Sequence, residues 1–220
     1  MRIASYNVFH GGLVELNMPV LGKDIAEIGA DLAGLQEIDQ FVKRSGNQDT
    51  LSLIAEAAGL PHRGFSRGID LQGGEYGTAL ISRYPIRSFT VTMLESGTAE
   101  QRSFGHAVLD VDGKEIHFIN THLSLGGAEN RAPQFAQIAA ELPADAPWIV
   151  TGDFNTQDFD EFAPLGGQLF NCPARRFGSF HPKDSAIDNI VLSHHWTITD
   201  GGMVDKKDSD HNMIWCDASL

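Results

Sequence analysis

The stretch Trp148-Ile149-Val150-Thr151-Gly152-Asp153 decides the fold class of this chain. A run of large apolar residues that ends in a small residue and an acid is typical of a buried strand with a carboxylate at its end. In α/β proteins such strand ends open into a crevice and are rigid, so they carry the chemistry. The stretch therefore predicts an α/β protein with a functional carboxylate, Asp153, at a sheet edge.

Two further polar clusters stand at the ends of predicted strands. They are Gln36-Glu37 and Ser209-Asp210-His211. Carboxylates presented beside His and Asn suit a hard divalent cation such as Mg²⁺. Mg²⁺ in turn suits the hydrolysis of phosphate esters, because the ion stabilises the charge that develops on the phosphate.

The remaining periodicity predicts mixed sheets covered by helices, in one domain over residues 1–220. Asp112-Gly113 predicts a tight hairpin turn, and residues 158–184 predict loops with short elements. Helices are expected over residues 20–28, 50–58 and 130–142, and strands over 2–9, 32–38, 78–82, 86–94, 104–111, 115–123, 148–153, 187–192 and 213–216.

Composition excludes some classes of protein. The chain has 220 residues, of which 42% are hydrophobic, which is enough for one large core. The net charge of −13 argues against a protein that grips long nucleic acid through many phosphates. A small phosphate ester bound through a metal stays compatible with this charge, because the ion supplies local positive charge.

The start of the chain and its cysteines bear on location. The first residues enter a strand pattern at once, without the apolar stretch and cleavage site of a signal peptide. No apolar run reaches the roughly 18 residues of a membrane span. Cys172 and Cys216 are too few for a disulfide framework and are expected to be reduced thiols. Together these features predict a cytoplasmic protein.

Three candidate residues have a structural interpretation beside the chemical one. Asn7 could cap a turn, or it could be a neutral oxygen ligand or hydrogen-bond donor beside a metal. Glu37 could be a solvated loop residue or a metal ligand. His122 could be an ordinary core histidine, or it could clamp a phosphate oxygen or protonate a leaving group.

Two pairs of residues suggest a shared site. Asp153 and Asn155 point to one side at a spacing of two, which suits a water-activating acid beside a phosphate-binding amide. Asp188 could orient His211 by accepting its ring N–H, and Asp210 could reach a metal.

Seven segments in this order resemble the endonuclease/exonuclease/phosphatase superfamily, which includes DNase I-like nucleases, apurinic endonucleases, inositol polyphosphate phosphatases and neutral sphingomyelinases. They span essentially the whole chain, and their joint order is far more specific than any one of them. The segments are Ser5-Tyr6-Asn7-Val8, Leu35-Gln36-Glu37-Ile38, Tyr76-Gly77-Thr78-Ala79-Leu80-Ile81-Ser82-Arg83-Tyr84-Pro85-Ile86, Asn120-Thr121-His122-Leu123, Gly152-Asp153-Phe154-Asn155, Ile187-Asp188-Asn189-Ile190 and Ser209-Asp210-His211.

The resemblance implies a four-layer α/β/β/α sandwich, two mixed sheets face to face with helices outside, and a site at one end. It implies that Glu37 is the principal Mg²⁺ ligand, assisted by Asn7 and Asp210, with Mn²⁺ as the alternative ion. Tyr76 could hydrogen-bond the substrate or pack at a strand start. Arg44 is the nearest cation in sequence to Glu37, and it could bind phosphate or lie in a solvated loop.

The resemblance also assigns the catalytic residues. His211, held by Asp188, contacts the scissile phosphate or serves as base, and Asp153 is the rival for that base. Asn155 stabilises the transition state, and His122 binds a phosphate oxygen or acts as acid. The chain departs from the family pattern after Asp188, where an aromatic residue is usual, and after His211, where proline is usual.

The resulting functional prediction is a Mg²⁺-dependent phosphoesterase that hydrolyses a small, lipid-like or nucleotide phosphoester. A nuclease acting on short or single-stranded ends is the alternative, since it needs few phosphate contacts. A catalytically idle binding module is disfavoured by the complete set of site residues, and a serine hydrolase by the absence of a G-x-S-x-G elbow around Ser209. Neither duplex DNA nor stable membrane insertion is expected, and the oligomeric state stays open.

Overall fold

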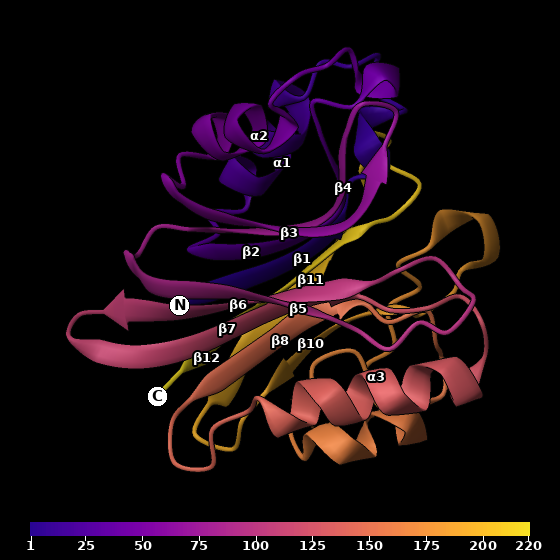
Figure 1. Ribbon diagram of the computed structural model, residues 1–220. Coiled ribbons are helices and arrows are strands. Elements are labelled where there is room, and N and C mark those ends of the chain that lie inside the picture. Colours follow the sequence, from indigo (N-terminus) through magenta and orange to yellow (C-terminus); the bar gives the residue numbers. More distant parts are fainter.

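The computed structural model describes residues 1–220 and consists of two six-stranded mixed sheets packed face to face (Figure 1). The first sheet contains, in spatial order, β11 (Thr197–Val204), β12 (Met213–Ser219), β1 (Arg2–Asn7), β2 (Leu32–Gln40), β4 (Gly74–Ser82) and β3 (His62–Leu71). The second contains β5 (Ile86–Met93), β6 (Ser103–Val111), β7 (Lys114–His122), β8 (Trp148–Asp153), β10 (Asp188–Leu192) and β9 (Gln168–Leu169). Only β1–β2 and β7–β8 pair in parallel.

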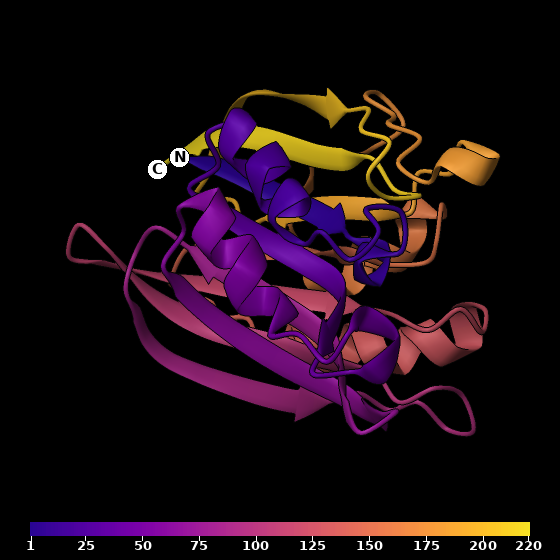
Figure 2. The ribbon, with the colours of Figure 1, turned by 90° about the horizontal axis from the view of Figure 1, so that it is seen from above.

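Helices cover the outer face of each sheet. Helices α1 (Pro19–Glu27) and α2 (Thr50–Ala58) lie on the first sheet, and α3 (Ala128–Ala140) with the 3₁₀ helix η3 (Phe159–Leu165) lies on the second (Figures 1 and 2). Three further 3₁₀ turns are short: η1 (Phe9–Gly11), η2 (Lys43–Ser45) and η4 (His181–Lys183). The order helix, sheet, sheet, helix confirms the four-layer sandwich.

Local sequence explains where helix α2 begins and ends. The carboxylate of Asp49 accepts a hydrogen bond from the backbone N–H of Ser52, which satisfies one of the free donors of the first turn. Gly59 ends the helix in the left-handed conformation at φ 69°, which glycine adopts without steric cost. The expected hairpin turn forms at Asp112 and Gly113, where both φ angles are positive.

Three apolar clusters hold the layers together. One lies between α1, α2 and the first sheet, one between the two sheets, and one between the second sheet, α3 and η3. The last contains a group of three packed rings, Phe135, Phe154 and Phe162. Each sheet is thus buried on both faces near its centre, as the sandwich requires.

A buried polar cluster joins the two sheets below one end of the sandwich. Asn120 of β7 donates from its amide to the carbonyls of Leu35 and Ala79 in the opposite sheet, at 2.8 and 2.7 Å. Its side-chain oxygen accepts from Gln36 at 2.7 Å and from Thr151 at 3.0 Å. These directional bonds fix how the two sheets lie over one another.

Most of the predicted elements occur within a few residues of the expected bounds, but β3 and β11 were not expected. In β3 the buried positions are Gly64, Ser66 and Gly68, so the strand has no apolar alternation to detect. The ring of Phe89 fills the space beside Gly64, where a Cβ would lie 2.5 Å from it. A strand that packs against a large ring from another strand needs small residues at its buried positions. Its sequence then lacks the alternating apolar pattern that predicts a strand.

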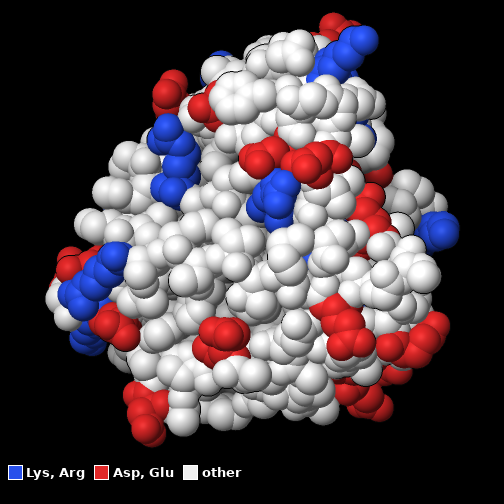
Figure 3. All heavy atoms as spheres, viewed as in Figure 1, with Lys and Arg blue, Asp and Glu red and all other residues white.

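The charged surface is dominated by ion pairs rather than by a basic tract. Acidic and basic side chains are interspersed on the face shown in Figure 3. Eight arginines lie within 4 Å of a carboxylate: Arg2, Arg44, Arg67, Arg83, Arg87, Arg102, Arg131 and Arg176. Few cations therefore remain for a polyanion. Both cysteines are free thiols, and each helix falls short of the length and apolar character of a membrane span.

Candidate active site

Three neighbouring strands of the second sheet place polar side chains in one row. Cross-strand pairing sets His122 of β7 beside Asp153 of β8, and Asp153 beside Asp188 of β10. All three are at most 5% exposed. Like charges directly opposite one another on antiparallel strands are destabilising, so the pair of aspartates is placed here at a cost to stability.

The first sheet contributes Glu37 and Asn7. The pairing of β2 with β4 shifts register between Leu35 and Ile38, and Glu37 lies in this bulge with φ 59°. A bulge re-aims a side chain, and here it directs Glu37 to the row on the other sheet. The amide of Asn7 donates to Glu37 at 3.1 Å and to Asp153 at 3.0 Å, so it bridges the two carboxylates.

His211 and Asp188 form a buried pair. Nδ1–H of His211 donates to Asp188 at 2.8 Å, which directs Nε2 toward Asp153 at 3.7 Å. Burial lowers the pKa of His211, but the charges of Asp188 and Asp153 outweigh it and raise the pKa to about 10. His211 is therefore an imidazolium at neutral pH. Ser209 supports the segment by donating to the carbonyl of Asn7 at 2.7 Å.

Asp153 lies at the centre of the site. One oxygen accepts from the backbone N–H of Asn155 at 3.0 Å, and the other faces His122, His211 and Asn7. Burial and the neighbouring charge of Asp188 raise the pKa of Asp153 to about 7, against the opposing effects of His211 and the hydrogen bonds. A carboxylate with a pKa near neutrality is suited to take a proton from water.

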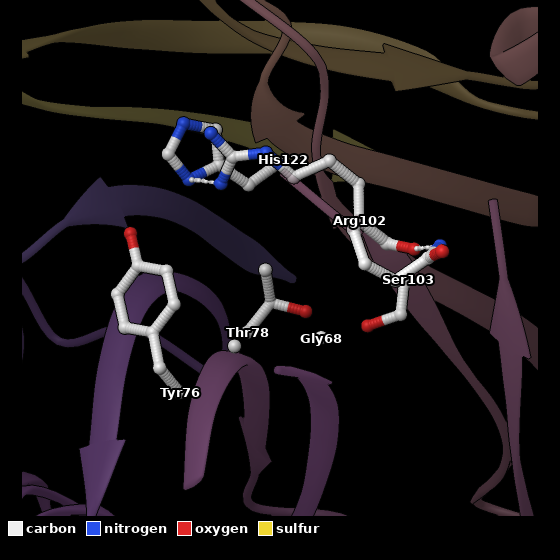
Figure 4. A pocket seen from close by; sticks show the side chains of 8 residues that line it. Gly68, Tyr76, Thr78, Arg102, Ser103 and His122 are labelled. Atoms are coloured by element: carbon white, nitrogen blue, oxygen red, sulfur yellow. Dashed lines mark hydrogen bonds between the residues drawn. The ribbon is translucent and has the colours of Figure 1, made fainter. Parts of the chain in front are cut away.

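Arg102 determines which ring nitrogen of His122 carries the proton. Nη1 of Arg102 lies 3.2 Å from Nδ1 of His122 (Figure 4). A guanidinium can only donate, so Nδ1 is the acceptor and the ring proton is on Nε2, which faces Asp153 at 3.4 Å. Burial and the charge of Arg102 hold the pKa of His122 well below its ordinary value. His122 is thus a neutral N–H donor.

The sequence of the chain matches a known protein family. The model of the Endonuclease/Exonuclease/phosphatase family matches residues 4–211, nearly the whole chain. The chain belongs to the endonuclease/exonuclease/phosphatase family. The resemblance of the seven sequence segments is therefore confirmed, and members of this family are phosphoester hydrolases.

One relative resembles the chain in sequence, and three solved structures resemble it in fold. YbhP of Escherichia coli is 28% identical over 170 residues, which cover 70% of this chain and 66% of YbhP. An endonuclease/exonuclease/phosphatase from Beutenbergia cavernae has a TM-score of 0.84 at 20% identity, covering all of this chain and 71% of that one. A mannosyl-6-phosphatase from Bacteroides thetaiotaomicron has a TM-score of 0.73 at 18% identity, with both chains fully covered. TDP2 of Danio rerio, in complex with a single-strand DNA product, has a TM-score of 0.76 at 19% identity, covering 100% and 99%.

The structure brings most of the predicted site residues of this family member together. The side-chain oxygen of Asn7 accepts from the backbone N–H of Phe9, which is the predicted turn cap, and its amide donates to Glu37 and Asp153. Asn155 has φ 53° and donates from its side chain to the carbonyl of Leu123 at 2.9 Å, which fixes its amide beside Asp153. The roles of these residues in catalysis remain predictions.

Tyr76 and Arg44 lie at the rim. Arg44 donates both arms of its guanidinium to buried Asp39, at 2.8 and 2.9 Å, and stacks over the ring of Tyr76. Arg44 therefore packs Tyr76 in place. If Arg44 also binds substrate, as the sequence predicted, it must do so with the guanidinium N–H groups that do not donate to Asp39. Burial raises the pKa of Tyr76, and the charge of Glu37 adds to the effect, so the phenol stays protonated.

Two site residues were missed in the sequence. Arg102 supplies the buried cation that was sought at Arg44, and it stands directly before β6 without any motif of its own. Nδ1 of His10 lies 3.4 Å from Glu37, in a backbone conformation with φ 43°. The only feature of the sequence that could have predicted the contact between His10 and Glu37 is the position of His10 just after the strand that carries Asn7.

The donor set fits a divalent cation. Burial raises the pKa of Glu37, but the hydrogen bonds from His10 and Asn7 lower it, to about 2. Glu37 is thus fully ionised, as a metal ligand must be. One oxygen of Asp210 is buried without any partner, which is the condition of a ligand atom that awaits an ion. Ligand atoms of Asp153, Asp188 and His211 also lie within 4.8 Å of one another, but His211 is protonated and donates to Asp188, so its imidazole is not free to bind an ion.

We predict that Arg102→Met lowers kcat roughly tenfold or more, because His122 loses the donor that selects its tautomer. Nitrogen NMR of the ring should show an unprotonated Nδ1 in the wild type and a proton shared between both nitrogens in the variant. Arg102→Lys should restore part of the activity, and Arg83→Met, at an exposed ion pair, is the matched control. A proton found on Nδ1 in the wild type would contradict the assignment.

Proposed function

We propose that this protein is a divalent-metal-dependent phosphoesterase that hydrolyses a small phosphoester by in-line attack of water. The observation that carries the proposal is the surroundings of one Asp153 oxygen. It lies 3.0 Å from the amide of Asn7, 3.4 Å from His122 and 3.7 Å from His211. A proton acceptor ringed by donors from both sheets is the arrangement that activates water beside a phosphate.

The two candidates for the base have different charges. His211 is protonated by its pairing with Asp188 and so cannot accept a proton, whereas the pKa of Asp153 is close to neutrality. We assign the base to Asp153. His211 then donates to a phosphate oxygen and stabilises the added negative charge, together with the amide of Asn155.

The reaction balances without a further reactant. Water loses a proton to Asp153 as its oxygen forms a new bond to phosphorus, and the bond between phosphorus and the alcohol oxygen breaks. Nε2–H of His122 donates a hydrogen bond to that departing oxygen, which takes a proton from solvent as the alcohol leaves, and Asp153 then returns its own proton to solvent. In-line displacement puts the water and the departing alcohol on opposite sides of the phosphorus atom.

We infer that Mg²⁺, with Mn²⁺ as the alternative, is held by Glu37 and Asp210, with Asn7 beside them. When bound, the ion neutralises charge on the phosphate. Since Glu37 and Asn7 come from one sheet and Asp153 from the other, the site needs both sheets, and we infer that residues 1–220 work as a single domain.

Surface charge limits the substrate. A net charge of −13 and arginines largely committed to ion pairs leave no tract for a long nucleic acid. A small phosphoester needs only the site itself. A nuclease acting on short single strands is the second candidate, and it needs few phosphate contacts.

The test is turnover of a panel with Mg²⁺, with Mn²⁺ and with EDTA. The panel holds p-nitrophenyl phosphate, bis(p-nitrophenyl) phosphate, sphingomyelin and a short oligonucleotide. We expect metal-dependent turnover of a small ester and its loss in EDTA. Turnover of the oligonucleotide alone would select the nuclease, and silence on all four would overturn the proposal.

Glu37→Gln is expected to raise the half-saturating Mg²⁺ concentration at least tenfold, because a neutral amide replaces the principal charged ligand. Calorimetric titration of Mg²⁺ into the variant measures this apart from catalysis. Glu56→Gln, at an exposed position of α2, is the matched control. Unchanged Mg²⁺ affinity in Glu37→Gln would remove Glu37 from the ligand set.

A further inference from the structure

A small polar pocket lies beside His122, between β3 and β4 of the first sheet and the start of β6 in the second. Thr78 and Ser103 lie on one side of it, and His122 with Arg102 lies on the other (Figure 4). Tyr76 is the only hydrophobic residue among the eight that line it. Such a lining does not suit an alkyl or acyl chain, which would leave these polar groups without partners.

The hydroxyl of Thr78 makes this a built site. Thr78 is 3% exposed, and its oxygen has no hydrogen-bond partner in the protein. Buried hydroxyls are nearly always partnered, because one without a partner has lost its hydrogen bonds to water and gained none in the protein. By contrast, the hydroxyl of Ser103 is already bonded to Ser66 at 3.0 Å. Thr78 is therefore the group in the pocket that awaits a partner.

The small volume of the pocket limits which chemical group can enter it. It offers about 10 Å³ to the centre of a water-sized sphere. This is close to the least that holds a single water, so one oxygen atom fits and a phosphate does not.

Two glycines set this size. A Cβ on Gly68 would lie 2.9 Å from the carbonyl oxygen of Gln101, and one on Gly77 would lie 2.0 Å from that of Ser66. Both positions therefore require glycine for the backbones to approach as closely as they do. The wall at these two glycines is backbone and cannot widen by a change of side-chain rotamer.

We propose that this pocket is a specificity subsite that takes a hydroxyl group from the alcohol part of the substrate. The inference rests on the proposed phosphoesterase function and deepens it. The departing alcohol oxygen is the one that accepts from His122 in the proposed reaction, and His122 also lines the pocket. A hydroxyl near the ester oxygen then reaches Thr78, so the substrate class is a polyol phosphate, such as a sugar or glycerol phosphate ester, and not an alkyl phosphate.

Matched pairs of esters test the subsite. We compare kcat/KM for 2-hydroxyethyl phosphate and ethyl phosphate, and for their p-nitrophenyl diesters, in the wild type and in Thr78→Val. The wild type should prefer the hydroxyl-bearing ester of a pair about tenfold, the effect of one buried hydrogen bond. In Thr78→Val, which keeps the shape of the side chain, the ratio should fall to about one.

Stability measurements guard against misfolding. Removing an unpartnered buried hydroxyl should leave the melting temperature of Thr78→Val equal to or above that of the wild type. Thr90→Val, on the exposed face of edge strand β5, is the matched control and should keep the tenfold preference. Equal rates for both esters in the wild type, or a preference that survives in Thr78→Val, would overturn the subsite and show that the pocket holds only a water. Hydrolysis of neither ester pair, with no turnover of the wider panel, would instead overturn the phosphoesterase function.

Discussion

Asp153→Asn is expected to lower kcat about 10³-fold, the middle of the range that a general base contributes. The amide keeps the volume of the carboxylate and one acceptor oxygen, but it cannot take a proton from water. KM should change little, because Asp153 acts on the water and not on the ester. Asp145→Asn, at an exposed loop position, is the matched control.

The pH profile gives the same assignment an independent test. A base must be ionised to act, and burial with the charge of Asp188 raises the pKa of Asp153 to about 7. The activity of the wild type should therefore fall as the pH drops below about 7, by a factor of ten per unit. The residual activity of Asp153→Asn should lose this dependence, and an unchanged acid limb in the variant would return the role of base to another group.

His211→Ala should lower kcat by about 10³-fold and also destabilise the fold by about 3–5 kcal/mol. The catalytic loss follows from removing the cation that faces the phosphate. The loss of stability follows because Asp188 is 1% exposed and its charge would remain buried without a partner. Urea unfolding measures the second effect, and exposed His194→Ala is the control.

Linkage makes the stability effect depend on pH in a defined direction. The pKa of His211 is raised to about 10 in the folded state, so its pairing stabilises the protein fully below its unfolded pKa of about 6.5 and is lost as the pH rises through 10. The gap between wild type and His211→Ala should thus be widest near pH 6 and shrink toward pH 10. Adding Asp188→Asn to His211→Ala should recover part of the stability. A gap that does not vary with pH would contradict the ion pair.

The elements that the sequence predicted correctly are those that bury their own apolar side chains. Residues 148–153 form β8 over the expected range, and Asp49 caps α2 as expected. The sequence did not predict β3, where small residues make room for Phe89 of the other sheet, because the apolar partner is more than twenty residues away in the chain. A strand of this kind is defined by its neighbour and not by its own pattern.

The residues of the candidate site also fall into two groups, those that the sequence predicted and those that it did not. Glu37, Asp153 and His211 stand in recognisable motifs at strand ends, and the structure gathers them. Arg102 and His10 have no motif, since their importance comes only from which atoms they face across the fold. Arg44 was chosen for its nearness in sequence, and Asp39, only five residues away, accepts two of its roughly five guanidinium N–H donors.

The allocation of strands to the two sheets has a consequence for synthesis of the protein. Residues 86–192 form the second sheet as one uninterrupted excursion, whereas the first sheet combines strands from both ends of the chain, with β1 paired to β12 (Figure 1). A nascent chain released before Asp210 could complete the second sheet, yet β1 would lack β12 on one side and the site would lack Asp210 and His211. Catalytic competence should therefore appear only when the final strand has left the ribosome, so premature termination products are expected to be inert rather than partly active.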